Sequence, residues 1–207
     1  MNQSQVAIST GVASQAAVSP WLLRGAAAVL GSVLVAVCAH VSVPLLFTPV
    51  PLTLQTFAVL LLGLTLGPGT AFCALVLYLL EGAAGLPVFS PHGPGGILQL
   101  MGPTGGYLLS YPFAAALAGF LAQRMRATFT TYVLSAAAGS LVILALGASW
   151  FAVAHQSVGM ALNMAVWPFL PGDALKVCGS AATALGIFRL RNRFRGPSAG
   201  LSDTAGV

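Results

Sequence analysis

The sequence has very few charged residues. Of its 207 residues, 5% are Asp, Glu, Lys or Arg, whereas 57% are hydrophobic. A soluble domain carries about 25% charged residues, so the charges here are too few to cover the surface of a water-soluble fold of this length. The composition therefore excludes a cytosolic enzyme, a secreted disulfide scaffold and a disordered protein. It indicates a chain that shows most of its surface to lipid.

The sequence also lacks a continuous basic face, although its formal net charge is +5. Nucleic-acid binding requires such a face. The arginines stand instead in short breaks between apolar runs, where anchoring at anionic lipid headgroups is the simpler interpretation. We therefore expect a lipid bilayer, and no nucleic acid, among the partners.

Motifs for metal binding, hydrolysis and phosphate binding are missing as well. The three cysteines lie far apart, and the three histidines stand in separate segments without the spacing of metal ligands. No GxxxxGK(S/T) loop is present for ATP, and no GxSxG or Ser–His arrangement is placed for hydrolysis. We expect no metal, no cofactor and no enzymatic activity.

Six apolar runs predict six membrane helices, because a helix needs about 20 mostly apolar residues to cross the hydrocarbon. We expect an all-α membrane protein, in which residues 21–195 form a six-helix transmembrane domain. A polar segment at residues 1–20 precedes it, and a disordered tail at residues 196–207 follows it. The expected spans are residues 25–43, 52–66, 71–86, 107–122, 129–153 and 171–190.

The positive charges predict the orientation of these spans. Seven of the eight Lys and Arg residues lie beside the termini or in the turn between the fourth and fifth spans. By the positive-inside rule, both termini are then cytoplasmic, and the protein is a multi-pass protein of the bacterial plasma or inner membrane.

Three long connections fall on the outer side in this orientation. They are rich in Pro, Gly and aromatic residues and are nearly uncharged. Irregular backbone near membrane depth is tolerated only where protein or a water-filled cavity covers it. We therefore expect these loops to cover an outer substrate pocket, rather than to be mobile surface loops. The connections are residues 43–51, 87–106 and 155–170.

Asp173 and Lys176 stand inside the last apolar run and give the strongest functional signal. They are three residues apart, so they share a helical face and could pair. Pro171 fits the first turn of a helix, which places Asp173 near the positive end of the helix dipole. The pair could fix the packing alone, but ionisable residues within a membrane span are functional by default. We expect it to bind a ligand.

Two further patterns leave two interpretations each. Ala28, Ser32 and Ala36 form a small-residue stripe on the first span, which suits either a partner-docking surface or internal helix packing. Thr53 and Gln55 begin the second span near the outer loops. They could donate hydrogen bonds to a ligand or bond to a neighbouring helix.

Several loop motifs, taken together and in this order, resemble the BioY family. They are Val43-Pro44, PVPLTLQT at residues 49–56, GLPVF at 85–89, GPTGGY at 102–107 and PFLPGDxxK at 168–176. The resemblance covers about residues 25–190. BioY proteins are the biotin-specific, substrate-binding S components of energy-coupling-factor (ECF) transporters. The resemblance implies a six-helix membrane protein that captures biotin from outside with high affinity.

The resemblance also implies roles for particular residues and partners. Asp173 would meet the ureido ring of biotin and Lys176 its valerate carboxylate, while the contact after the LPVF motif would fall near Ser90 or His92. A transmembrane coupling protein and ABC-type ATPases would energise transport, or the protein would self-associate if it is solitary. The expected ligand-binding residues are Asp173, Lys176, Thr53, Gln55, Phe89, Ser90, Gly96 and Tyr107, and the expected docking residues are Ala28, Ser32 and Ala36.

Two other classes of function stay open. One is an S component for another vitamin, or a self-sufficient secondary transporter. Neighbouring genes for a coupling protein and ATPases would distinguish the S component from the self-sufficient transporter. The other is a membrane enzyme, in which Asp173 and Lys176 would act as acid and base. Turnover of a substrate by the purified protein would identify the latter.

Overall fold

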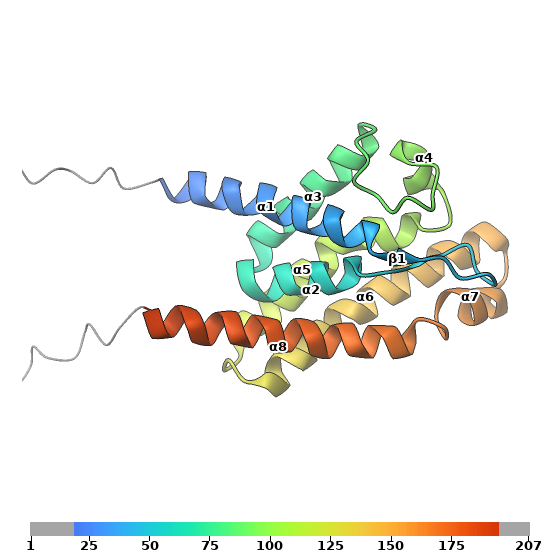
Figure 1. Cartoon of the computed structure of the whole chain (residues 1–207). Coiled ribbons are helices and arrows are strands. Elements are labelled where there is room, and N and C mark those ends of the chain that lie inside the picture. The colour runs from blue at the N-terminus through green and yellow to red at the C-terminus, as the bar shows by residue number, and fades with distance from the viewer. Residues whose placement is uncertain (1–18, 195–207) are drawn as a thin grey trace, which may run out of the picture.

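The computed structural model describes residues 19–194. The expected disordered tail and nearly all of the expected polar N-terminal segment lie outside the described residues. The described chain consists of helices and one pair of very short strands (Figure 1). In chain order these elements are α1 (Pro20–His40), β1 (Ser42–Val43), β2 (Leu52–Thr53), α2 (Gln55–Leu66), α3 (Pro68–Ala83), α4 (Gly96–Met101), α5 (Gly105–Arg124), α6 (Phe129–His155), α7 (Val158–Ala165) and α8 (Leu170–Phe194).

A helix occupies each of the six predicted apolar runs, although the bounds differ. The first helix begins five residues earlier than expected, with Pro20 at its first position, where the missing N–H of proline is least costly. Pro68 begins α3 in the same way, directly after Gly67, whose φ of +80° makes the tight turn from α2. The last helix begins at Leu170, so Pro171 lies in its first turn as predicted.

Helices α1, α5 and α6 are long and apolar enough to cross a membrane by length and composition. Helices α2 and α3 are apolar but have only 12 and 16 residues. Helix α8 has 25 residues and carries an acidic residue in its first turn and arginines in its last. The chain is therefore a mostly helical membrane protein.

The bundle core forms two clusters of buried hydrophobic side chains. The first lies towards the loops and contains Tyr78, Tyr107, Tyr111, Phe151 and Phe169, whereas the second lies towards the helix ends near Ala122 and Tyr132. Between them, glycines let α2 and α5 approach closely: a Cβ on Gly119 would lie 2.6 Å from the carbonyl oxygen of Gly63. Helix α8 packs along α2 and α6 on the other side (Figure 1).

Short elements that the sequence did not predict flank the first long connection and lie within the other two. β1 pairs with β2 in antiparallel register, α4 lies in the second connection, and α7 lies in the third. Figure 1 places these elements at one end of the bundle, opposite the end where α1 begins and α8 ends. Phe89 and Phe169 from these connections are buried, whereas Leu46, Phe47 and Trp167 are exposed. The apolar loop residues are therefore only partly folded inwards.

The small-residue stripe on α1 faces α3, which favours internal packing over partner docking. Ser32 is fully buried, and its hydroxyl donates to the carbonyl oxygen of Val29 at 2.9 Å and to Oε1 of Glu81 at 3.2 Å. Ala28 is buried too, and Ala36 packs against the first core cluster. That Ala28, Ser32 and Ala36 dock a partner stays a prediction beside this packing role. The spacing shows that small residues share one face of the helix, but it does not show which neighbouring helix packs against that face.

We expect Ser32→Leu to destabilise the protein, because a larger side chain must fit between α1 and α3 and the hydrogen bond to Glu81 is lost. Overpacking of this kind lowers the free energy of unfolding by about 1–3 kcal/mol. Denaturant titration in detergent measures the change. Val33→Leu, on the exposed face of α1, is the matched control. Equal stability of the two variants would show that the stripe is not a packing surface.

Candidate functional site

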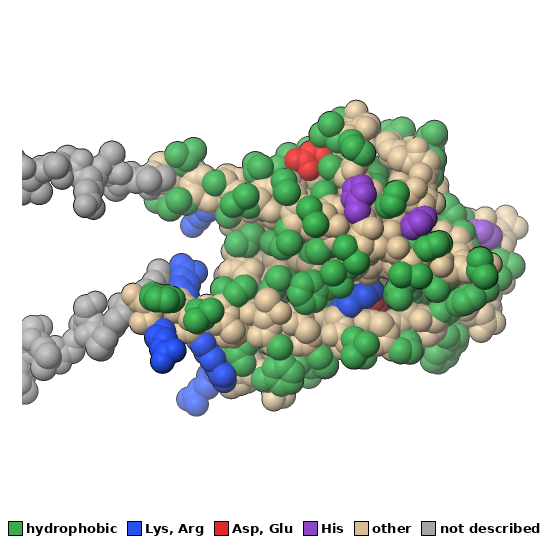
Figure 2. Space-filling view, viewed as in Figure 1, with side chains coloured by type: hydrophobic (Ala, Val, Ile, Leu, Met, Phe, Trp, Pro, Cys, Tyr) green, Lys and Arg blue, Asp and Glu red, His purple; other side chains and the backbone are tan. Residues whose placement is uncertain are grey.

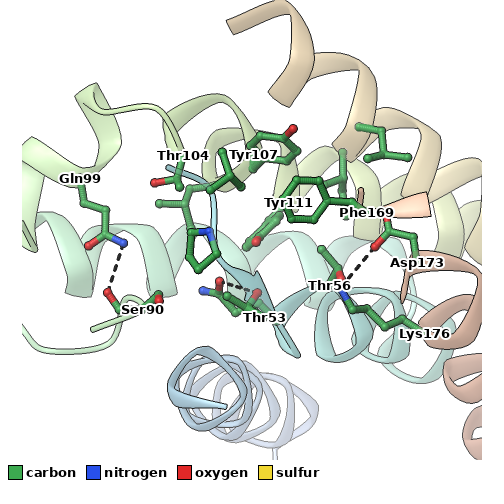
Figure 3. Close-up of a pocket in the computed structure, with 16 residues that line it drawn as sticks. Thr53, Thr56, Ser90, Gln99, Thr104, Tyr107, Tyr111, Phe169, Asp173 and Lys176 are labelled. Carbon is green, nitrogen blue, oxygen red and sulfur yellow. Dashed lines mark hydrogen bonds and ion pairs between the residues drawn. The ribbon is translucent and has the colours of Figure 1, made fainter. Parts of the chain in front are cut away.

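A narrow cavity lies at the loop end of the bundle, where α2, α5, α6 and α8 meet the segments before β2 and α5 (Figure 3). Water centres can occupy about 50 Å³ within it. Its walls combine one ion pair, several hydroxyl and amide groups, and apolar side chains. The lining residues are Val50, Pro51, Thr53, Gln55, Thr56, Ser90, Gln99, Thr104, Tyr107, Leu108, Tyr111, Ile143, Leu144, Phe169, Asp173 and Lys176.

Asp173 and Lys176 form an ion pair in the wall of this cavity. Nζ of Lys176 lies 3.3 Å from Oδ1 of Asp173, and the two side chains are only 12% and 10% exposed. Their spacing places both on the same face of α8, and the position of Asp173 in the first turn matches the positive end of the helix dipole. Burying two charges is costly unless they are paired. The pair therefore keeps both charges available inside an otherwise uncharged wall.

A chain of hydrogen bonds joins Thr53 and Gln55 to the neighbouring helix α3. The Thr53 hydroxyl donates to Oε1 of Gln55 at 3.1 Å, and Nε2 of Gln55 donates to the Tyr78 hydroxyl at 2.5 Å. The Tyr78 hydroxyl in turn donates to the carbonyl oxygen of Val88 at 3.1 Å. Thr53 and Gln55 thus bond within the protein and also line the cavity, and their bonding to a ligand stays a prediction.

Gln99 links two loop segments beside the cavity. Its side-chain oxygen accepts the N–H of Gly95 at 3.2 Å, and its side-chain nitrogen donates to the carbonyl oxygen of Ser90 at 3.3 Å (Figure 3). Gly95 and Gly96 have φ of +71° and +60°, a region that L side chains rarely adopt. The glycines thus make the turn that allows Gln99 to reach back to Ser90.

Tyrosines form much of the apolar wall. Tyr107 and Tyr111 are buried one turn apart on α5, and the Tyr107 hydroxyl donates to the carbonyl oxygen of Ala165 at the end of α7. The ring of Tyr107 lies against Gly147 of α6, where a Cβ would overlap it. The third connection and α6 therefore hold this ring at the cavity wall.

Two buried hydroxyl groups at the cavity have no hydrogen-bond partner among the described residues. They are Oγ1 of Thr56 and Oγ of Ser90, and the other such side-chain oxygen in residues 19–194, that of Ser42, lies outside the lining. A buried polar group without a partner costs about 1–3 kcal/mol. Such groups at a cavity wall are suited to hydrogen bonding with a bound polar molecule.

Comparison with known proteins assigns the family. The family model for the "BioY family" matches residues 10–193 of this chain. The chain belongs to the BioY family. It is 41% identical over 139 residues to the "Probable biotin transporter BioY" of Pyrococcus horikoshii, which covers 66% of this chain and 77% of that protein. It is 38% identical over 157 residues to the "Biotin transporter BioY" of Thermotoga maritima, covering 76% and 90%.

A solved structure shares the fold of this BioY-family chain. It is the crystal structure of the S-component for biotin from an ECF-type ABC transporter, with a TM-score of 0.74 and 23% sequence identity. The match covers 85% of this chain and 95% of that chain. The chain therefore shares the overall fold of that structure.

The structure brings six of the eight ligand-binding residues predicted for this BioY-family chain to one cavity. Phe89 and Gly96 do not line it. Phe89 packs edge-on against Tyr78, with ring centroids 5.4 Å apart, and its ring fills the space beside Gly82. Gly96 is the first residue of α4 and forms part of the turn before that helix. The six residues that line the cavity are Asp173, Lys176, Thr53, Gln55, Ser90 and Tyr107.

Sequence reasoning missed several lining residues. Gln99 is the one amide in an apolar stretch of the second connection, which is a usable signal for a buried polar contact. Tyr111 follows Tyr107 by one helical turn and shares its face. Thr56 adjoins the predicted Gln55, but nothing in the sequence shows which of its neighbours faces the cavity. Within residues 19–194, no group of three or more His, Cys, Asp or Glu side chains could hold a metal ion.

We expect Tyr78→Phe to destabilise this BioY-family fold through its lost hydroxyl. Phe keeps the ring contact with Phe89, but Nε2 of Gln55 loses its acceptor inside the protein. An unpaired buried donor lowers the free energy of unfolding by about 1–3 kcal/mol, which denaturant titration in detergent measures. Tyr132→Phe is the control, since the Tyr132 hydroxyl makes no hydrogen bond with another described residue. Equal, small effects would show that the hydrogen-bond chain carries no stability.

Proposed function

We propose that this protein takes up biotin as the substrate-binding S component of an ECF-type transporter, capturing biotin from the extracytoplasmic side with high affinity. The observation that carries the proposal is the buried Asp173–Lys176 pair in a cavity that also holds two unpartnered hydroxyls, in a member of the BioY family. The names of the two relatives support biotin as the substrate.

The chemistry of biotin fits this wall. Its ureido head has two N–H donors and a carbonyl acceptor, its fused rings and tail are apolar, and the tail ends in a carboxylate. Asp173 accepts from the ureido N–H groups, the hydroxyls of Thr56 and Ser90 bond to polar atoms of the ligand, and Tyr107 and Tyr111 cover the apolar part. Lys176 pairs with the carboxylate through a charge-assisted hydrogen bond.

Binding requires Lys176 to leave Asp173. The two polar ends of biotin lie at opposite ends of the molecule, so one ligand satisfies both residues only when their charged groups move apart. The lysine side chain has a flexible four-carbon stem, which permits that movement. The cavity has a volume of about 50 Å³, which is narrow for a bicyclic ligand. The loop segments that line it therefore move outwards as well.

Energy for import comes from a separate transmembrane coupling protein and ABC-type ATPases. The absence of a GxxxxGK(S/T) motif from the sequence supports this division of labour. Self-association is the arrangement we expect if no such partners accompany the protein. Neither arrangement requires catalysis by Asp173 or Lys176.

The chain crosses the membrane six times, with both termini in the cytoplasm and the cavity on the outer side. Figure 2 supports this topology, because the Lys and Arg side chains gather at the end of the bundle where α1 begins and α8 ends, with one exception near the middle. Figure 1 places β1, α4 and α7 at the opposite end. Positive charge beside membrane spans favours the cytoplasmic side.

Lys176→Met is expected to weaken biotin binding by about 10- to 100-fold, because a charge-assisted hydrogen bond to the carboxylate is lost. Methionine keeps the apolar stem of the side chain and removes only its charge. A biotin analogue whose tail ends in an amide never forms the ion pair, so its affinity should fall much less. Equilibrium binding of both ligands to the purified variant measures the difference.

Asp173→Asn is the companion variant, and it should weaken both ligands to a similar degree because they share the ureido head. Each single substitution leaves the other charge of the pair unpaired. The thermal unfolding midpoint of each variant must therefore be measured beside its affinity. Equal losses for both ligands in folded Lys176→Met protein would show that Lys176 does not contact the carboxylate.

The topology can be tested with single cysteines at the two ends of the bundle. In a background without the three native cysteines, Arg126→Cys should react with a membrane-impermeant maleimide only after the cells are opened. His92→Cys, on the exposed loop between α3 and α4, should react in intact cells. His92 is preferable to the adjacent Gly93, where a Cβ would lie 2.6 Å from the Gln99 side chain. The reverse pattern of labelling would overturn the proposed orientation.

A further inference from the structure

A second cavity lies far from the proposed ligand site, at the basic end of the bundle. It is a groove between the first turns of α1, the turn from α2 to α3, and the end of α5, and water centres can occupy about 590 Å³ of it. The residues that matter here are Trp21, Arg24, Ala28, Leu66, Cys73 and Gln123.

The lining of this groove changes from polar to apolar with depth. At the mouth, the Arg24 guanidinium lies over the Trp21 ring at 5.3 Å from its centroid, and Gln123 contributes a side-chain amide. Ala28 lies four residues further along α1, which is about 6 Å deeper at 1.5 Å per residue. Cys73, five residues after the first residue of α3, also lines the groove. The groove thus presents hydrogen-bond donors above an apolar floor.

The charge at this end has one sign. In the described residues every arginine lies within the first turns of α1, at the end of α5, in the following turn or at the end of α8. The two acidic residues of residues 19–194 lie elsewhere: Glu81 near the loop end of α3 and Asp173 at the start of α8. Among residues 19–194, a molecule that enters the groove therefore meets positive charge without a competing carboxylate.

We propose that this groove binds one anionic phospholipid, with its phosphate at Arg24 and Gln123 and the upper part of an acyl chain along Ala28 and Cys73. Arg24 lies near the start of an apolar helix that is long enough to cross a membrane. The ends of such a helix lie at the depth of the lipid headgroups. Tryptophan and arginine are typical of that interface. The apolar floor favours a lipid over a free phosphate ion, which has no group to place there.

Fluorescence of Trp21 tests the proposal directly. The chain has three tryptophans, so Trp150→Phe with Trp167→Phe leaves Trp21 as the one reporter. The full-length protein is placed in phosphatidylcholine nanodiscs that contain lipid brominated on its acyl chains, either phosphatidylglycerol or phosphatidylcholine at the same mole fraction. Bromine quenches indole on contact. We expect phosphatidylglycerol to quench with an apparent preference of about fivefold, the effect of one cation near the surface.

Two arginine variants separate a groove from general surface charge. Arg24→Gln should abolish the preference for phosphatidylglycerol. Arg124→Gln removes the same charge at the same end of the bundle, but Arg124 lies outside the groove lining and over the Phe120 ring. This variant should retain the preference. If Trp150→Phe prevents folding, because its indole donates to the carbonyl oxygen of Gly102, the difference in quenching between the native protein and Trp21→Phe gives the same reading.

Two results would overturn the proposal, and shielding of Trp21 would extend the first of them. Equal quenching by both lipids would show that the groove does not select anionic lipid. Equal loss of preference in Arg24→Gln and Arg124→Gln would assign the effect to surface charge as a whole. Equal quenching by both lipids, together with shielding of Trp21 from an aqueous quencher such as acrylamide, would show that a protein segment fills the groove instead.

Discussion

A polar group that enters a bilayer must find its partner inside the protein, because hydrocarbon offers none. This constraint governs the loop end of the structure. Thr53, Gln55 and Tyr78 bond in series to a loop carbonyl, and Gln99 bonds to two separate loop segments. Each of these side chains satisfies backbone or side-chain groups that would otherwise be unpaired near membrane depth. The loops can therefore be irregular and still lie against the bundle.

The same constraint gives meaning to the groups that the protein leaves unsatisfied. Thr56 and Ser90 have buried hydroxyls at the cavity without a partner among the described residues, while the neighbouring Gln55 and Gln99 side chains hydrogen-bond within the protein. We interpret the engaged amides as the frame of the site and the free hydroxyls as its contact points.

Much of the fold follows from the sequence, because membrane helices are long apolar runs bounded by Gly, Pro and Arg. The six runs became helices, and Pro171 and Asp173 took the positions that helix-start chemistry predicts. The short elements did not follow. α4, α7 and the β1–β2 pair are too brief for a periodic pattern, and their positions depend on tertiary contacts such as the hydrogen bond from Tyr107 to Ala165.

The site was predictable where a residue type was unusual in its surroundings. Asp173 and Lys176 are charges in an apolar run, so their place in a polar cavity could be predicted from the sequence, while their contact with a ligand stays a prediction. The place of Phe89 was not predictable, because an aromatic residue in a loop motif suits a ligand wall or a protein core equally. In the structure it packs against Tyr78 and Gly82. For the same reason, the sequence did not show which helix packs against the small-residue stripe that contains Ser32. Spacing identifies a face, whereas its neighbour depends on the packing of α3.

In the binding mode proposed above, the Asp173–Lys176 pair also sets what a ligand must offer. While the two residues pair, each charge is satisfied, so a ligand that reaches only one of them leaves the other buried and unpaired. Breaking such a pair from one side costs about 3–5 kcal/mol. A ligand that offers N–H donors to Asp173 and a carboxylate to Lys176 replaces both halves of the interaction at once. The internal ion pair therefore discriminates by exclusion, since a molecule with only one matching group competes against a bond that the protein already makes with itself.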